Sequence, residues 1–431
     1  MASRKRYVLV GVGQRSRHFI AALLGEHAAH VDLAALCDAN AESLAARVRE
    51  LGPAGKGLRT YDAAEFDRML EAERPETVIV LTPDRTHAEY VCRAMRAGCD
   101  VVVEKPLATT AADCRQVLSA QRETGRTCRV GLNYRYAPWN TTIKRLLVEG
   151  TIGRVVSVAM RKSLGMRRGA SYFHRWHARM DRSGGLLVHK GTHYFDLVNF
   201  FVGSIPRTVY ARGGQRLFTD ATRQRLGLER PGRRCGECEE ASRCPFYADV
   251  ADGPESAEVV AARAAGDGYS RDLCVFRPEA DIPDTMHLVA EYESGALLNY
   301  SLLAYGDASS DAVLYGTHGR LVITGPALHV VPYGGEAYDV SPPREEGSHG
   351  GADPRMFRDL FGASAPADAL GCASDAHAGA AAALVGIAAT ESMATGRPVG
   401  LRDLAPELET PAFVANGEQP KGFDVGALRA W

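Results

Sequence analysis

Two short motifs that lie far apart in the sequence carry the side chains best suited to proton transfer. Lys105 directly follows the apolar segment 100–104. His189 and His193 follow a pair of glycines, and Asp196 lies three residues further on. The i, i+4, i+7 spacing of these three residues predicts that they share one face of a helix. A lysine at the carboxyl end of a strand can meet such a face across a cleft, so Lys105, His193 and His189 are the predicted catalytic residues.

The first glycines of the chain match a dinucleotide-binding fingerprint, because they follow an apolar strand and precede a helix. Gly11 permits a tight turn, Gly13 lets the backbone approach a pyrophosphate, and the helix start offers N–H donors. Ser16 stands in place of the third glycine and is small enough to be tolerated. Asp38 lies 25 residues after Gly13 and is placed to accept hydrogen bonds from both ribose hydroxyls. A carboxylate there repels a 2′-phosphate, so NAD is predicted, with NADP as the alternative.

A second loop is expected on the same edge of the sheet. Thr82, Pro83 and His87 follow or end another apolar strand, 77–82. Ligands bind along the carboxyl edge of such sheets, which predicts a cofactor role for these residues. A plain helix cap, punctuated by Pro83, is the alternative interpretation.

The pattern of strands and helices that must position these groups changes along the chain. Apolar strands alternate with helices over 1–134, which predicts a doubly wound parallel sheet, a Rossmann-type α/β domain. Longer strands joined by turns over 135–372 predict an α+β domain with an open, mainly antiparallel sheet. A polar, cysteine-rich insertion is expected at about 213–283. Residues 373–431 are expected to form a C-terminal helix and a tail that pack back on the domains.

Composition limits the classes of binding partner and the cellular location that we expect. Lys plus Arg number 51 against 52 Asp plus Glu, a net charge of −1, which predicts neither nucleic acid nor a membrane as partner. The basic N-terminus precedes only a short apolar run rather than a signal-peptide core. No stretch of about 20 apolar residues is evident from the sequence. We therefore expect a cytoplasmic protein.

Four cysteines are grouped in the polar insertion: Cys235, Cys238, Cys244 and Cys274. A Cys-x₂-Cys pair supplies two soft ligands from one turn, and zinc takes four at tetrahedral corners. The first interpretation is therefore a structural zinc ion. An iron–sulfur cluster and four unligated thiols are the alternatives.

Taken together, the motifs resemble those of the Gfo/Idh/MocA oxidoreductase family of sugar and cyclitol dehydrogenases. The resemblance implies that Lys105 lies near the nicotinamide and the reacting hydroxyl. Family members commonly carry an Asp where this chain has His189, and an imidazole there can itself take a proton. His193 and Lys105 are therefore the expected acid/base pair, and His189 is a second base or a substrate partner. The segments that carry the resemblance are Gly11-Val-Gly13, Asp38, Thr82-Pro83-Asp84 with His87, Glu104-Lys105-Pro106, Gly131-Leu-Asn133-Tyr134-Arg135, Glu149–Gly153, Gly184–Asp196, Gly316–Gly319 and Gly386–Pro398.

The predicted reaction is NAD-dependent hydride transfer at a ring hydroxyl or ketone of a sugar, glycoside or cyclitol, by a homo-oligomer. Two alternatives are a redox-neutral epimerase or glycoside-cleaving enzyme with tightly bound NAD, and a non-catalytic sensor of NAD and sugar. The predicted cofactor-binding residues are Gly11, Val12, Gly13, Gln14, Arg15, Ser16, Asp38, Thr82, Pro83, His87, Glu104, Lys105 and Asn133. The predicted substrate residues are Tyr134, Arg135, Trp176, Lys190 and Asp196; for the aromatic and arginine side chains, interface packing is the alternative.

Overall fold

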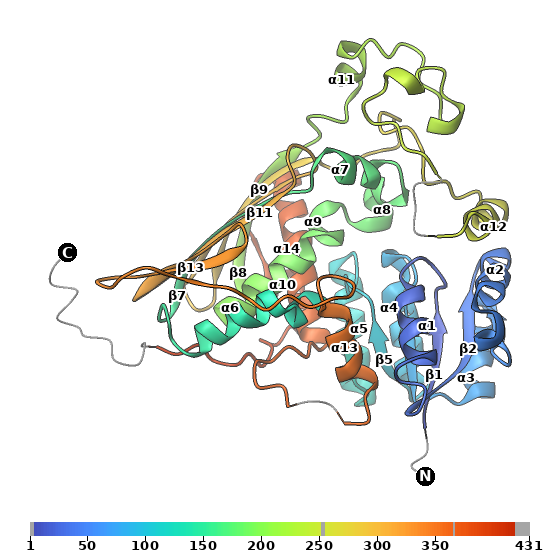
Figure 1. Cartoon of the computed structure of the whole chain (residues 1–431), viewed down its shortest axis with the longest axis horizontal. Helices are drawn as coiled ribbons and strands as arrows, with labels where there is room; N and C mark the ends of the chain where they lie inside the picture. The colour runs from blue at the N-terminus through green and yellow to red at the C-terminus, as the bar shows by residue number, and fades with distance from the viewer. Residues whose placement is uncertain (1–3, 251–254, 365–366, 419–431) are drawn as a thin grey trace.

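The first part of the chain folds into a six-stranded parallel sheet whose strands are connected by helices (Figure 1). The computed structural model describes residues 4–250, 255–364 and 367–418. The strand order β3-β2-β1-β4-β5-β6, with every neighbouring pair parallel, is the predicted Rossmann-type arrangement. The strands are β1 (Lys5–Val10), β2 (Val31–Asp38), β3 (Arg59–Asp62), β4 (Thr77–Val80), β5 (Asp100–Val103) and β6 (Cys128–Val130), and the helices are α1 (Ser16–Leu24), α2 (Ala41–Leu51), α3 (Phe66–Glu73), α4 (His87–Arg96) and α5 (Ala111–Thr124).

Apolar strands and capped helices explain this layout. The central strands β1 and β4 bury Val8 to Val10 and Val78 to Val80 completely, as expected for a sheet covered on both faces. Asn40 starts α2 by accepting a hydrogen bond from the Ser43 amide, 2.9 Å away, and Thr110 does the same for α5. Each strand is therefore followed by a helix that begins near the carboxyl edge of the sheet, where a ligand would bind.

The second part contains a nine-stranded sheet, in the order β14-β13-β12-β11-β7-β10-β9-β8-β15. β10 runs parallel to β7, and the other neighbouring pairs are antiparallel. The predicted open, mainly antiparallel sheet is thus confirmed, with one parallel pair that the sequence did not reveal. The strands are β7 (Val155–Ser163), β8 (Pro206–Gly214), β9 (Thr285–Tyr292), β10 (Leu297–Leu303), β11 (Ser309–Gly316), β12 (Gly319–Thr324), β13 (Ala327–Pro332), β14 (Tyr338–Val340) and β15 (Val399–Gly400).

Helices cover one face of this sheet, and α10 and α14 pack against it and against each other (Figure 1). The segment 333–355 contains β14 and the start of α13. The proposed domain boundaries stay predictions, and the tail beyond residue 418 lies outside the described residues. The helices of this part are α6 (Pro138–Val148), α7 (Met166–Phe173), α8 (Met180–Ser183), α9 (Leu186–His189), α10 (Gly191–Val202), α13 (Ala352–Phe361), α14 (Ala376–Thr395) and α15 (Leu401–Leu404).

The expected single helix carrying His189, His193 and Asp196 is interrupted. α9 ends at His189 and α10 begins at Gly191, with Lys190 between them at φ −102° and ψ −38°. Gly191 leaves no room for a side chain, because a Cβ there would approach the Phe195 ring to 2.7 Å. His189 therefore lies on α9, whereas His193 and Asp196 lie on α10, and the three side chains make different contacts.

Among the described helices, α14 is the one whose length and composition would suit a membrane span, a feature that the sequence reading overlooked. Most of its apolar window is buried inside the protein. Its alanines and Gly386 allow α9 to come close, since a Cβ on Gly386 would lie 2.5 Å from the Leu187 carbonyl oxygen. These contacts are those of a core helix.

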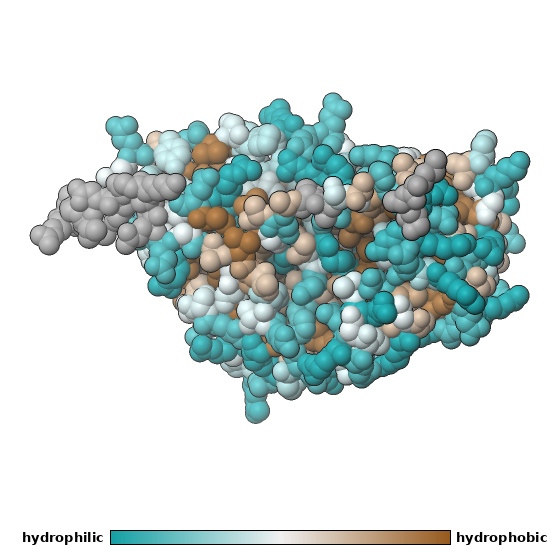
Figure 2. Space-filling model, turned by 90° about the horizontal axis from the view of Figure 1, so that it is seen from below, coloured by the Kyte–Doolittle hydropathy of each residue, from teal (hydrophilic) through white to brown (hydrophobic). Residues whose placement is uncertain are grey.

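The insertion reaches from the nine-stranded sheet across to the first domain (Figure 1). It contains α11 (Asp220–Arg225), two short 3₁₀ turns and α12 (Ala257–Asp267). α12 lies beside α2 and buries Val259. Seen from below, the molecule presents mainly hydrophilic side chains, with apolar ones in several separate patches (Figure 2). The insertion thus adds a wall next to the carboxyl edge of the parallel sheet.

Candidate functional site

A cleft of about 940 Å³ runs along the carboxyl edge of the parallel sheet. One wall is the fingerprint loop after β1, with Asp38 at the end of β2. The floor comes from the loops after β4 and β5, including Lys105, and His189 lies at one end. The insertion supplies the opposite wall, from Glu255 to Arg271. Such a location at strand ends is where open α/β sheets bind ligands.

The fingerprint residues fit a dinucleotide. Gly11 has φ +95°, and a Cβ on it would lie 2.5 Å from Leu81 carbonyl carbon, so the fold itself requires glycine. At Gly13 no protein atom lies within 4 Å of such a Cβ among the described residues. The fold does not require glycine at this position, which suits a backbone approached by a pyrophosphate. Ser16 is buried and its hydroxyl donates to the Gly13 carbonyl oxygen at 2.7 Å, stabilising the turn before α1.

Asp38 is oriented by backbone amides. Its Oδ2 accepts from the Val12 N–H at 2.7 Å, and its Oδ1 accepts from the Asn40 N–H at 2.8 Å. Burial raises the pKa of the carboxyl, and these two amides oppose that rise. Each oxygen keeps a further lone pair for a ribose hydroxyl. The geometry is therefore that of a ribose-binding carboxylate.

Arg15 lines the cleft, and its side chain is held in a network of charged and polar groups. Its Nε donates to Glu104 Oε1 at 2.6 Å, and its Nη1 donates to Asp353 Oδ2 at 2.6 Å. Asn133 Nδ2 donates to the same Asp353 carboxyl at 2.7 Å, and His349 contacts it at 2.9 Å. Burial alone would raise the pKa of Asp353, but bonds from His349 and Arg15 hold it far below its ordinary value. Arg15, Glu104 and Asn133 thus tie the cofactor loops to α13.

His87 joins the two loops that floor the cleft. Its buried ring places Nδ1 2.7 Å from the Pro106 carbonyl oxygen and Nε2 2.8 Å from the Thr82 carbonyl oxygen. The loop after β4 is thereby fixed to the loop that carries Lys105. His87 has a positioning role, while Thr82 and Pro83 line the cleft.

Lys105, His189 and Asp84 meet across the cleft. Lys105 Nζ donates to the His189 carbonyl oxygen at 3.0 Å, and His189 Nδ1 lies 2.5 Å from Asp84 Oδ2. Asp84 lies in the loop after β4, so the pair joins the parallel-sheet domain to α9. Asp84 is part of the motif Thr82-Pro83-Asp84, but it was not among the predicted site residues. Its partner, His189, is far away in the chain, and no spacing rule connects the two.

The electrostatics favour a neutral imidazole held by a carboxylate. Burial raises the pKa of Asp84 to about 6, and the Lys105 charge opposes this rise. Burial, followed by the Lys105 charge, lowers the pKa of His189 well below its ordinary value. Near neutral pH the His189 Nδ1–H therefore donates to an ionised Asp84, leaving Nε2 as an acceptor. A carboxylate-oriented imidazole beside a lysine can move a proton to or from a hydroxyl or an acidic carbon.

Aromatic rings surround His189. The His177 ring centroid lies 4.3 Å away, and Tyr172 and Trp176 make edge contacts at 5.7 and 5.8 Å. Trp176 stacks on His177 at 3.9 Å and lines the cleft. Trp176 is thus exposed to the cleft, and its contact with a sugar ring stays a prediction.

A second group of predicted residues lies behind this surface. His193 is buried and stacks on Tyr134 at 4.0 Å, and Lys190 Nζ donates to the Tyr134 hydroxyl at 2.9 Å. Burial lowers the pKa of Lys190 to about 7 and that of His193 well below its ordinary value. Neither residue lines the described cleft, and His193 Nδ1 has no hydrogen-bond partner among residues 4–250, 255–364 and 367–418. The expected pairing of His193 with Lys105 is replaced by His189 with Asp84.

Arg135 and Asp196 were predicted to contact the substrate, and the structure corrects this prediction. Both are buried, and the guanidinium donates to the carboxylate at 2.6 to 3.1 Å through Nε and Nη2. Neither lines the cleft. Their mutual pairing anchors α10 to the segment after β6, which explains the residue types without a substrate.

The insertion contacts the cofactor wall through Glu255. This buried carboxylate accepts hydrogen bonds from Arg263 and Arg271 and pairs with Arg47 of α2. Arg47 in turn donates to the Val12 carbonyl oxygen at 3.3 Å. Asn40 Nδ2 donates to the Arg263 carbonyl oxygen at 3.1 Å. Glu255, Arg263 and Arg271 were not identified from the sequence, because only the folded insertion brings them to the fingerprint.

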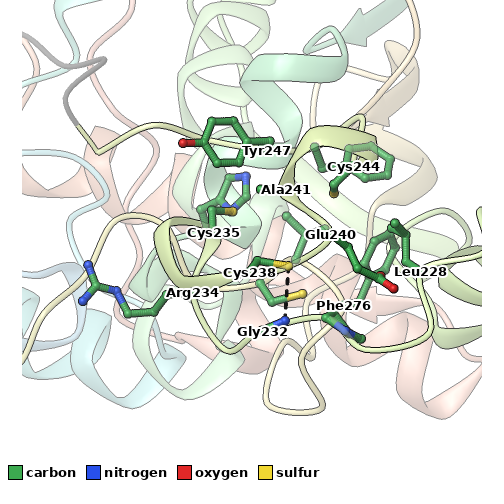
Figure 3. A pocket seen from close by; sticks show the side chains of 15 residues that line it. Leu228, Gly232, Arg234, Cys235, Cys238, Glu240, Ala241, Cys244, Tyr247 and Phe276 are labelled. Atoms are coloured by element: carbon green, nitrogen blue, oxygen red, sulfur yellow. Dashed lines mark hydrogen bonds between the residues drawn. The ribbon is translucent and has the colours of Figure 1, made fainter.

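The four clustered cysteines line one small pocket together with His174 (Figure 3). Cys235 Sγ lies 4.0 Å from His174 Nδ1, and Cys238 Sγ accepts from the Gly232 N–H at 3.2 Å. Across the described residues, however, no three His, Cys, Asp or Glu side chains converge closely enough to hold a metal ion. The predicted zinc site is therefore not supported, and all four are free thiols.

Most of the chain matches models of known protein families. Residues 5–132 match "Oxidoreductase family, NAD-binding Rossmann fold", and residues 144–401 match "Oxidoreductase family, C-terminal alpha/beta domain" of the Gfo/Idh/MocA proteins. The putative oxidoreductase YteT of Bacillus subtilis is 31% identical over 422 residues, 93% of this chain and 98% of its own. An inositol 2-dehydrogenase of Rhizobium meliloti is 30% identical over 48% of this chain and 57% of its own. An aldose-aldose oxidoreductase from Caulobacter crescentus shares the fold, with a TM-score of 0.63, 20% identity, and coverage of 92% of this chain and 100% of its own.

Proposed function

The chain belongs to the Gfo/Idh/MocA oxidoreductase family, and on that premise we propose that it transfers a hydride between NAD and a ring hydroxyl or ketone of a sugar, glycoside or cyclitol. The observation that carries the proposal is the Lys105–His189–Asp84 constellation at one end of the cofactor cleft. Family membership makes the chain an oxidoreductase, and the non-catalytic sensor loses its support. The homologous inositol 2-dehydrogenase favours a polyol substrate.

Each residue has a distinct task in this proposal. His189 Nε2 accepts the hydroxyl proton during oxidation and returns it during reduction. Asp84 keeps the imidazole in the tautomer with Nδ1–H and stabilises the charge that forms on it. Lys105 stabilises the developing alkoxide through its ammonium group. When bound, the nicotinamide supplies the hydride acceptor or donor, and Asp38 selects the unphosphorylated ribose.

The first test is turnover with a panel of sugars and cyclitols, followed by absorbance and mass spectrometry. Wild type should reduce NAD with one class of polyol and exchange it with free cofactor. Lys105→Ala should lose turnover by roughly 10²-fold or more while still binding NAD. If wild type produced NADH with none of the polyols, net dehydrogenation would be contradicted.

A second candidate reaction is redox-neutral, with NAD retained through oxidation and re-reduction. The observation favouring it is the wall formed by the insertion around Glu255, Arg263 and Arg271, which surrounds the fingerprint side of the cleft. His189, oriented by Asp84, could also remove a C–H proton beside a transient ketone, as epimerisation or elimination requires. Product formation in D₂O, with deuterium in the product and no net NADH, would select this reaction over the first.

A further inference from the structure

Arg175 is a cation of the cleft that has no carboxylate partner among the described residues. It lies between α7 and the 3₁₀ turn of Trp176, is half-buried, and lines the cleft. Its Nε donates to the Ser171 carbonyl oxygen at 2.7 Å, and its Nη2 donates to the Ser171 hydroxyl at 3.2 Å. These bonds hold the side chain in place and leave its charge uncompensated.

Three of the other arginines that line the cleft, by contrast, have a carboxylate partner. Arg263 and Arg271 share Glu255, and Arg179 pairs with Asp181 at 2.9 Å. Around Arg175 the structure places cations and phenols instead: Arg271, Arg168, Tyr269 and Tyr172. No carboxylate lies within ion-pair distance of Arg175 in the described part of the chain. Burial lowers the pKa of Arg175, because a desolvated charge is costly without a counter-ion.

The position of Arg175 points to the substrate end of the cleft. Its charge acts on His189 and His177, and the next residue, Trp176, stacks on His177. A second guanidinium, Arg277, bonds to the Arg175 carbonyl oxygen at 3.3 Å and lines the same wall. The fingerprint, by contrast, offers the amides of the α1 start for the cofactor pyrophosphate. The unpaired cation is therefore grouped with the proton-transfer residues rather than with Asp38.

We propose that the substrate carries a carboxylate or phosphate group and that Arg175 binds this anion. The inference rests on the proposed function, since it concerns the substrate of that same site. Guanidinium binds either anion through two parallel N–H donors, and such charge-assisted bonds are about twice as strong as neutral ones. A charged sugar such as a uronate or a sugar phosphate is thus preferred over its neutral parent.

The test compares matched sugars on the NAD-loaded enzyme. D-glucose, D-glucuronate and D-glucose 6-phosphate, with the corresponding galactose set, are measured for binding by calorimetry and for kcat/KM. Wild type should favour one charged member over its neutral parent by about tenfold or more. Arg175→Met should remove most of this preference, and Arg175→Lys should restore part of it. Arg145→Met, which removes an exposed cation of α6 outside the cleft, is the control and should keep the preference within about twofold.

The outcomes separate the two proposals. A preference for the uronate identifies a carboxylate, and a preference for the 6-phosphate identifies a phosphate. Equal binding of charged and neutral sugars by wild type, or an unchanged preference in Arg175→Met, overturns the inference. If Arg175→Met bound NAD more weakly and kept its sugar preference, Arg175 would belong to the cofactor site. This result would also overturn the inference. If no sugar is oxidised, the proposed function fails, but calorimetry still decides whether Arg175 selects an anion. NAD affinity and Tm show whether each variant is folded.

Discussion

At the scale of single residues, the main result is that a buried carboxylate orients His189. Asp84 comes from the loop after β4 and His189 from α9, so the pair exists only when the two domains meet. His189 and Asp84 therefore bring an imidazole and a carboxylate together from two different parts of the cleft lining.

Replacing Asp84 tests this arrangement. The pKa of Asp84 is raised in the folded protein to about 6, above its unfolded value. Its contribution to stability is thus present below the unfolded pKa and is lost as pH rises through about 6. Asp84→Asn should therefore unfold at a similar or higher denaturant concentration than wild type at pH 7. Its kcat/KM should nevertheless fall by roughly 10²- to 10⁴-fold.

The pH profile provides the matching measurement. In wild type, kcat/KM should fall as pH drops through about 6, because protonating Asp84 removes the acceptor for His189 Nδ1–H. Asp84→Asn should lack this limb. Asp403→Asn changes an exposed carboxylate on α15, outside the cleft, and should keep the wild-type profile. Full activity of Asp84→Asn would remove the proposed role of the pair.

At the scale of elements, the insertion joins the second domain to the cofactor wall. α12 packs along α2, and Glu255 holds Arg47, Arg263 and Arg271 around one carboxylate. Arg47 also pairs with Glu50, whereas Arg263 and Arg271 have no other ion pair among the described residues. Removing the Glu255 carboxylate therefore leaves Arg263 and Arg271 unpaired near the fingerprint.

Glu255→Gln should therefore loosen the wall and weaken NAD binding. We expect the Kd for NAD to rise by about 5- to 50-fold, equivalent to roughly 1 to 2.3 kcal/mol, with faster release of bound cofactor. The readout is the quenching of protein fluorescence on titration with NADH. Glu258→Gln is the matched control on α12, since its pair with Arg49 is exposed on both sides and should matter little. Equal NAD affinity in both variants would mean that the insertion does not contribute to the cofactor site.

At the scale of the whole molecule, the described helices cover one face of the open sheet and leave the other without a helical cover (Figure 1). On β9 and β10 the outward positions include Val289 and Leu297, which are 52% and 56% exposed. Open antiparallel sheets with apolar outer residues are suited to pairing with a second copy. This face is our candidate for the predicted homo-oligomer interface.

Light scattering after gel filtration checks this prediction. Wild type should elute as a multiple of 46.4 kDa, and Val289→Arg should shift the protein toward the monomer, because a charge would be buried at the interface. Tyr247→Arg alters an exposed apolar side chain on the insertion and should leave the mass unchanged. A monomeric wild type at the concentrations used for catalysis would contradict the prediction.

The sequence by itself determined the parallel sheet, the fingerprint with Asp38, and Lys105 at a strand end, because periodicity, turn chemistry and strand-end position are local properties of the chain. It also favoured the open sheet, through alternating strands such as β9. Only the tertiary structure decided that Lys190 interrupts the helix, that Arg135 and Asp196 pair internally, and that Arg15 binds Asp353. It likewise brought Asp84 to His189 and the insertion to the cofactor wall. These are contacts between segments far apart in sequence, and they depend on how the two domains pack rather than on any spacing along the chain.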